Sequence, residues 1–148
     1  MALASVTKTF LTQALASRSA AREIIGLLNS LSGSLATVTF AVAVEAANNI
    51  DVTIQVKDEW GNNVTSVHAL DVLLVATAAA LAFNANAYTI TATAGNVVEP
   101  VAAKVLKVLT TAAGLATIRL NNVAAVTCFM AVQLNSSQLS VSPTITHV

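Results

Sequence analysis

The chain has 148 residues, 55% of them hydrophobic and only 9% charged, and its seven Lys and Arg balance its seven Asp and Glu. This length suits a single domain, and seven scattered cations form no basic patch, so nucleic-acid binding is disfavoured. A typical soluble chain is about 25% charged, so we expect much of this surface to be covered by other protein. The longest apolar stretch, residues 72–83, is shorter than the roughly 18 residues of a membrane-spanning helix, so no membrane partner is expected.

The first 34 residues divide into two segments. Residues 1–16 are rich in Ala and Thr without clear periodicity, and they predict an N-terminal arm. In residues 17–34, apolar residues recur at three- and four-residue steps before Gly33, which predicts a short amphipathic helix and a linker. This helix either covers the open end of the domain or docks, with the arm, on a neighbouring subunit. The apolar residues expected to make such contacts are Phe10, Leu11, Leu15, Ile24, Leu27, Leu28 and Leu31.

From residue 35 onward the sequence is typical of short β-strands. The clearest case is residues 50–57, in which Ile and Val alternate with polar residues. Such alternation puts one face of a strand on a core and leaves the other in water. Seven or eight short strands separated by turns predict a β-sandwich over residues 35–148. The expected strands are 38–44, 50–57, 67–76, 86–93, 103–110, 114–121, 125–134 and 138–146.

Turn and breaker residues separate these strands. Residues 58–61 (Asp-Glu-Trp-Gly) and 111–114 (Thr-Ala-Ala-Gly) both have Gly at the fourth position and predict type I turns. The Ala-rich residues 76–87 predict a loop or one helical turn that joins the two sheets. Pro143 cannot donate to a strand ladder, so the last strand is expected at a sheet edge or with a bulge.

Beyond this periodicity, four stretches carry a recognisable residue pattern: 20–29, 38–58 with the Gly-Asn turn that follows, 110–118, and 129–145 with their Asn-Ser-Ser hairpin. The last three resemble Ig-like modules of tailed-bacteriophage virion proteins, and the first resembles a segment that precedes such modules. The similarity covers most of residues 18–146. Two features depart from it, namely Glu59-Trp60 in a turn where small or polar residues are usual, and the strongly apolar residues 76–87.

The resemblance implies a mainly β protein, an Ig-like β-sandwich of seven to eight strands behind the arm and helix, acting as a phage structural protein. Its implied function is capsid decoration (cement). Many copies, or a homo-oligomer, would bind the major capsid protein on the virion surface after synthesis in the host bacterial cytoplasm. The alternative is a tail- or fibre-associated adhesion module that binds the host surface. The charge-poor surfaces expected to be covered are residues 1–16, 72–87 and those after Lys107, where Arg119 is the only charge.

The sequence offers no catalytic constellation, so we expect no enzyme, no small-molecule substrate and no cofactor. A nucleophile needs an adjacent base. The two histidines, however, lie at a predicted strand start (His68) and next to the last residue (His147), and Cys128 lies mid-strand, where a free Cys acts as a small hydrophobe. Residues 58–63 bring together oxygen atoms that Ca²⁺ uses, but without EF-hand spacing, and an ordinary turn is the favoured interpretation.

Trp60 is the only Trp of the chain and lies in a predicted turn. Aromatic residues are enriched at interface hot spots. We therefore treat Trp60 as an interface candidate, with packing inside the chain as the alternative. An adhesion module needs exposed aromatic side chains at its loop tips, and Trp60 and Tyr88 are the residues available for that role.

Overall fold

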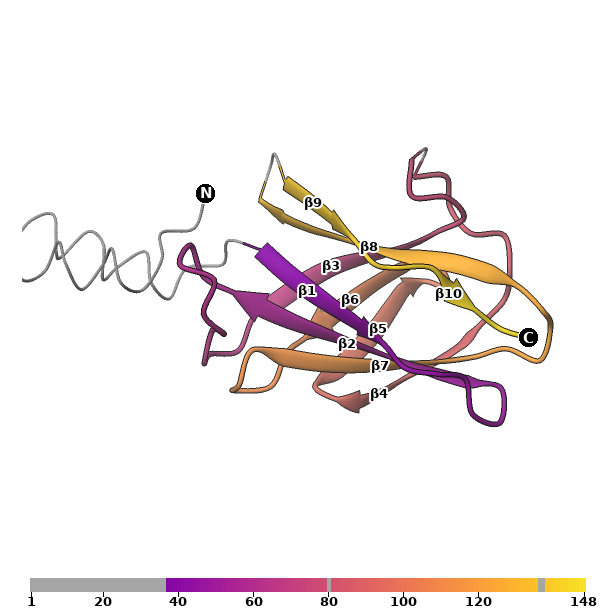
Figure 1. The fold of residues 1–148 in the computed structure, drawn as a ribbon, viewed down its shortest axis with the longest axis horizontal. Coiled ribbons are helices and arrows are strands. Elements are labelled where there is room, and N and C mark those ends of the chain that lie inside the picture. The colour runs from indigo at the N-terminus through magenta and orange to yellow at the C-terminus, as the bar shows by residue number, and fades with distance from the viewer. Residues whose placement is uncertain (1–36, 80, 136–137) are drawn as a thin grey trace, which may run out of the picture.

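The computed structural model describes residues 37–79, 81–135 and 138–148 (Figure 1). The predicted arm (1–16) and the predicted helix and linker (17–34) lie outside these ranges and stay predictions. The same holds for the interface residues placed in them, which are Phe10, Leu11, Leu15, Ile24, Leu27, Leu28 and Leu31.

The described part consists of ten strands and their connections, with no helix. All pairings between these strands are antiparallel. The strands are β1 (Thr37–Val42), β2 (Asn49–Lys57), β3 (Ala69–Val75), β4 (Thr89–Ala94), β5 (Asn96–Val101), β6 (Val105–Leu109), β7 (Leu115–Asn121), β8 (Thr127–Asn135), β9 (Gln138–Val141) and β10 (Ile145–Thr146).

The strands form two sheets. One has the order β1-β2-β7-β4, and the other has the order β10-β8-β3-β6-β5, with β9 also paired to β8. β9 and β10 lie along the same side of β8, because Ala131 of β8 pairs with Val141 on one side and with Leu73 of β3 on the other. Pro143 separates these two short strands at the sheet edge, as the sequence predicts.

One hydrophobic core lies between the sheets. In β2, Ile50, Val52, Ile54 and Val56 are at most 1% exposed, and they alternate with half-buried residues. The core cluster also contains residues of the other sheet, such as Met130. Two antiparallel sheets that share one core are consistent with a β-sandwich, and each buried aliphatic side chain contributes roughly 1.5–3 kcal/mol.

The expected strands are present, with shifted ends and two differences. β5 was not predicted, because its Glu99-Pro100 sequence interrupts any alternation. The strand expected over 138–146 is divided into β9 and β10 around Pro143. Residues 76–87 connect β3 to β4, which belong to different sheets, and the described residues of this connection form a loop.

Two glycine turns close the ends of β2 and β7 on the side where β1 begins. Gly61 donates to the Asp58 carbonyl at 3.0 Å and Gly114 to the Thr111 carbonyl at 2.9 Å, which are the bonds expected of these turns. Both glycines have positive φ, +79° and +66° respectively. A Cβ on Gly61 would meet no atom within 4 Å, whereas a Cβ on Gly114 would lie 2.1 Å from the carbonyl oxygen of Val64.

This difference predicts unequal effects of the same substitution. Gly61→Ala should lower the free energy of unfolding by about 1 kcal/mol, since only the left-handed backbone is strained. Gly114→Ala should lower it by about 2–4 kcal/mol, because the Val64 backbone must also move. Urea unfolding followed by circular dichroism measures both values. Equal losses would show that the contact with Val64 has no energetic weight.

Candidate functional site

Three connections and the last residues meet at one end of the two sheets. Asn122 donates from its backbone to the Asn48 carbonyl at 3.1 Å and from its side chain to the Ala87 carbonyl at 2.8 Å. The backbone N–H of Val148 donates to Oε2 of Glu45 at 2.8 Å. We call this region the loop end and define it as residues 43–48, 84–88, 122–126 and 146–148; it surrounds the C-terminus in Figure 1.

The loop end carries exposed apolar side chains and no unpaired side-chain carboxylate. Val44, Val123 and Val148 are 92%, 82% and 88% exposed. Glu45 is the only acidic or basic residue of these segments apart from His147. Its side chain is 11% exposed and its carboxylate already accepts two contacts, one from Val148 and one from His147. Apolar surface of this kind can serve as an interaction site when it is contiguous, and we therefore treat the loop end as the candidate interaction surface.

The polar side chain of His147 is buried beneath the loop end. The His147 side chain is 0% exposed, with Nδ1 3.2 Å from Oε1 of Glu45. Its ring centroid lies 5.7 Å from that of Tyr88. Burial raises the pKa of Tyr88 well above its ordinary value, so this phenol stays neutral. His147 therefore anchors the last residues of the chain and is out of reach of any substrate.

The residues considered for catalysis do not form an accessible nucleophile–base pair. Cys128 is 0% exposed on the core face of β8, where burial raises the pKa of its thiol and keeps it neutral. His68 lies in the β2–β3 connection at the other end of the sheets, with Nε2 2.9 Å from Oγ of Ser66. Among the described residues, no group of three or more His, Cys, Asp or Glu could hold a metal ion.

The turn at residues 58–63 is closed by its own aspartate. Asp58 is 2% exposed, and its Oδ1 accepts from the backbone N–H groups of Trp60 and Asn62, both at 2.9 Å. These bonds satisfy the carboxylate within the turn, which favours the turn interpretation over a Ca²⁺ ligand. Trp60 itself is 7% exposed, so most of its ring is packed inside the chain and offers little area to a partner.

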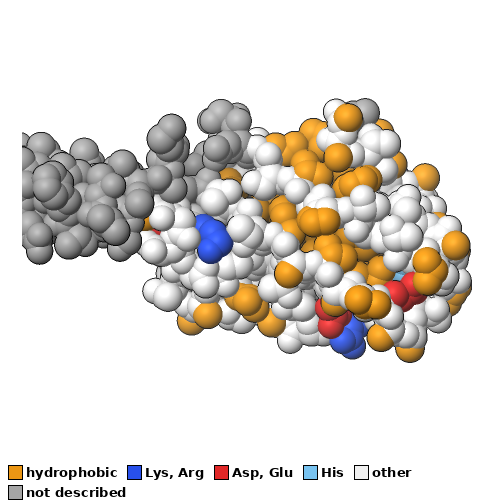
Figure 2. Space-filling model, in the orientation of Figure 1, with side chains coloured by type: hydrophobic (Ala, Val, Ile, Leu, Met, Phe, Trp, Pro, Cys, Tyr) orange, Lys and Arg blue, Asp and Glu red, His pale blue; other side chains and the backbone are white. Residues whose placement is uncertain are grey.

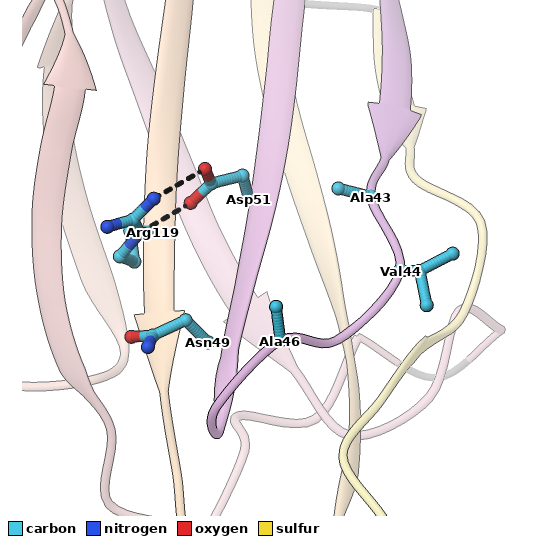
Figure 3. A pocket seen from close by; sticks show the side chains of 6 residues that line it. All are labelled: Ala43, Val44, Ala46, Asn49, Asp51 and Arg119. Carbon is cyan, nitrogen blue, oxygen red and sulfur yellow. Dashed lines mark hydrogen bonds and ion pairs between the residues drawn. The ribbon is translucent and has the colours of Figure 1, made fainter.

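A shallow depression of about 150 Å³ is lined jointly by residues within 43–46 of the loop end and by the four-stranded sheet (Figure 3). At its floor Arg119 of β7 donates two parallel hydrogen bonds to Asp51 of β2, from Nε to Oδ1 and from Nη2 to Oδ2, both at 2.8 Å. These hydrogen bonds from Arg119 hold the pKa of Asp51 below its ordinary value. Because each charge is used by the other, we interpret the pair as structural, and the depression offers no free charge to a ligand.

The outer faces of the two sheets differ in polarity. The four-stranded sheet carries threonines, and Oγ1 of Thr53 lies 3.1 Å from Oγ1 of Thr117 across β2 and β7. The six-stranded sheet instead exposes Val98, Leu109 and Leu139 to 65%, 42% and 40%. On the side of the molecule shown in Figure 2, hydrophobic side chains gather over β8, β9 and β10, and charged ones are sparse.

Comparison with known proteins gives no match: no family model, no curated protein and no solved structure matches the chain. Within the described ranges, no helix has the length and hydrophobicity needed to cross a membrane.

Sequence reasoning did not single out the exposed valines of the loop end. Val123 and Val148 do fall within the charge-poor segment after Lys107, so low charge density was a usable signal for them. Val44 gave no such signal, because it ends an alternating run whose other members are strand residues. Its exposure depends on which loops the fold brings together.

The burial of Cys128 predicts that its thiol reacts slowly in the folded protein. In the folded protein it should react with Ellman's reagent at least about 100-fold more slowly than in guanidinium chloride, because a neutral, buried thiol reacts only after local opening. The rate of absorbance change at pH 8 measures this. Similar rates in the two states would show that Cys128 is accessible in the native protein.

The lowered pKa of Asp51 predicts a pH-dependent contribution to stability. At neutral pH, Asp51→Asn should cost at most about 1 kcal/mol, since both side chains are partly solvated. A depressed carboxyl pKa stabilises the fold above the unfolded pKa, about 3.9, and this is lost as the pH falls through the folded pKa. The difference from wild type should therefore shrink below about pH 4. Arg119→Gln is the control and should remove the same pH-dependent part, as measured by urea unfolding from pH 2 to 7.

Proposed function

We propose that this chain is a structural virion protein of a tailed bacteriophage, an Ig-like β-sandwich that binds the capsid exterior in many copies and stabilises it as a decoration (cement) protein. Its partner is the major capsid protein. The observation that carries the proposal is the loop end, where exposed valines lie on hydrogen-bonded loops without a free side-chain charge. The phage context comes from the sequence resemblance.

The strand order supports the Ig-like part of the proposal. In Ig constant-type domains one sheet has the order ABED and the other CFG. If β1, β2, β7 and β4 take the places of A, B, E and D, then β3, β8 and the β9/β10 pair take those of C, F and G. The β5–β6 hairpin departs from this scheme, because it extends the second sheet beside β3 but lies between β4 and β7 in the chain.

The chemistry of the loop end supports attachment to another protein. The centres of protein–protein interfaces are depleted of charged residues, and this end presents Val44, Val123 and Val148 with no unpaired charged side chain. Each attachment of so small an end would be modest. Attachment of many copies, or of a homo-oligomer, to a repeating capsid lattice would add avidity without new contacts.

The adhesion alternative receives less support. It needs exposed aromatics at loop tips, but Trp60 and Tyr88 are only 7% and 8% exposed. Among the described residues, Phe83 is the exposed aromatic, at 52%. A single phenylalanine favours contact with protein over stacking on host carbohydrate.

Co-sedimentation with capsids tests the proposal. Purified capsids of the encoding phage, stripped of this protein, are mixed with the recombinant chain, and the pellet is analysed. The double variant Val44→Asp/Val123→Asp should bind at least about tenfold more weakly than wild type, because it places unpaired charges in the contact. The matched control Asn63→Asp/Thr65→Asp adds the same charge at the opposite end and should bind normally.

Two outcomes would overturn the proposal: no pelleting of the wild-type chain with capsids, or binding to host cells instead. Deletion of residues 1–16 distinguishes the two candidate anchors. If the arm is the anchor, its deletion should abolish binding while the β-type circular dichroism spectrum is kept. If the loop end is the anchor, binding should survive.

A further inference from the structure

On the outer face of the six-stranded sheet, residues that pair across neighbouring strands form rows that run across the sheet. Leu109 of β6 lies between Asn96 and Ala69 in one row. Val105 of β6 lies beside Leu73 in another. A depression of about 210 Å³ follows this face. Its lining residues are Ala69, Asn96, Val98, Lys107, Val108 and Leu109. Apart from Asn96 and one further row, the residues named on this face are apolar.

The remaining row contains the only two charges among the outward-facing strand residues described on this face. Lys107 forms an ion pair with Asp71, its partner in the β3–β6 ladder. Both side chains stay open to solvent, at 60% and 53% exposure. Val98 flanks Lys107 on β5, and Gln133 flanks Asp71 on β8. A positive and a negative charge thus lie side by side within an apolar surface.

The neighbouring sheet edge is a poor docking site. β5 is the edge strand, and Pro100 within it has no N–H to donate. The register between β5 and β6 also shifts between Val98 and Val101. Proline and irregular register both oppose the addition of a further strand. An approaching protein would therefore meet the face of this sheet and not its edge.

We propose that this face, defined as Ala69, Val98, Leu109, Leu73, Val105 and Leu139 around the Lys107–Asp71 pair, binds the same face of a second copy of the chain about a two-fold axis. In a two-fold interface, residue i of each copy meets residue j of the other. A patch with one Lys beside one Asp is then its own complement, since Lys107 of each copy opposes Asp71 of the other. The proposal does not depend on the virion function.

The size of the face agrees with a reversible dimer. Five strands about 4.8 Å apart, crossed by three rows about 6.8 Å apart, cover roughly 500 Å² per copy. Two such faces bury about 1,000 Å² in total, which is close to the minimum for a specific interface. The dimer should accordingly form and dissociate with concentration, while the loop ends remain free for another partner.

Sedimentation velocity on the full chain tests the dimer between about 1 and about 100 µM, where an interface of this size is expected to titrate. Wild type should change from monomer to dimer. Val98→Asp should weaken dimerisation at least about tenfold by placing an unpaired charge in the interface. Thr39→Asp, on the exposed face of the other sheet, and Val44→Asp, at the loop end, should dimerise normally. Leu139→Lys replaces Val98→Asp if the latter fails to fold.

A charge exchange tests the two-fold arrangement itself. The double variant Asp71→Lys/Lys107→Asp keeps the pair within each copy and should form homodimers like wild type. Mixed with labelled wild type, it should form few heterodimers, because like charges then oppose each other across the interface. Native mass spectrometry counts the species. A statistical mixture, or a wild-type monomer at every concentration, would overturn the proposal, whether or not the chain binds capsids.

Discussion

The packing of β2 against the opposite sheet is the constraint on which the rest of the structure depends. Four consecutive inward side chains of this strand, Ile50, Val52, Ile54 and Val56, are almost completely buried. Each contributes roughly 1.5–3 kcal/mol by leaving water. Cys128 is the only cysteine of the chain, so no internal disulfide assists them. β2 and its neighbour β7 also carry the other features described above. These are the two glycine turns, the ion pair of Arg119 and two of the connections of the loop end.

Hydrogen bonds make the loop end an ordered surface. Asn122 ties two other connections to its own, and Glu45 holds the ring of His147 and the backbone of Val148. The exposed valines are therefore positioned before any partner arrives, and little conformational entropy has to be lost on binding. Burial of His147 beside Tyr88 keeps the imidazole and the phenol away from this surface.

Much of the fold could be predicted from local patterns, whereas the candidate sites could be predicted only in part. Alternation of apolar and polar residues identifies β2 and β7, because each strand has one face in the core and one face toward solvent. Gly61 and Gly114 identify the turns next to them. β5 has no such signal, since Pro100 breaks its pattern. Trp60 was a candidate for a contact surface, yet it is mostly buried, because a turn residue can fold back on its own domain. The strand topology decides which loops lie together at one end of the sheets. The local sequence of a single segment does not determine that topology.

The two prolines of the chain occupy opposite edges of the same sheet, Pro100 within β5 and Pro143 between β9 and β10. A protein with so little charge has weak electrostatic protection against aggregation, and open sheet edges are the usual route to fibres. With both edges interrupted, the six-stranded sheet can stack on another sheet but cannot be extended by one. Self-association through this sheet should therefore stop at a small, closed assembly and remain compatible with high local concentration.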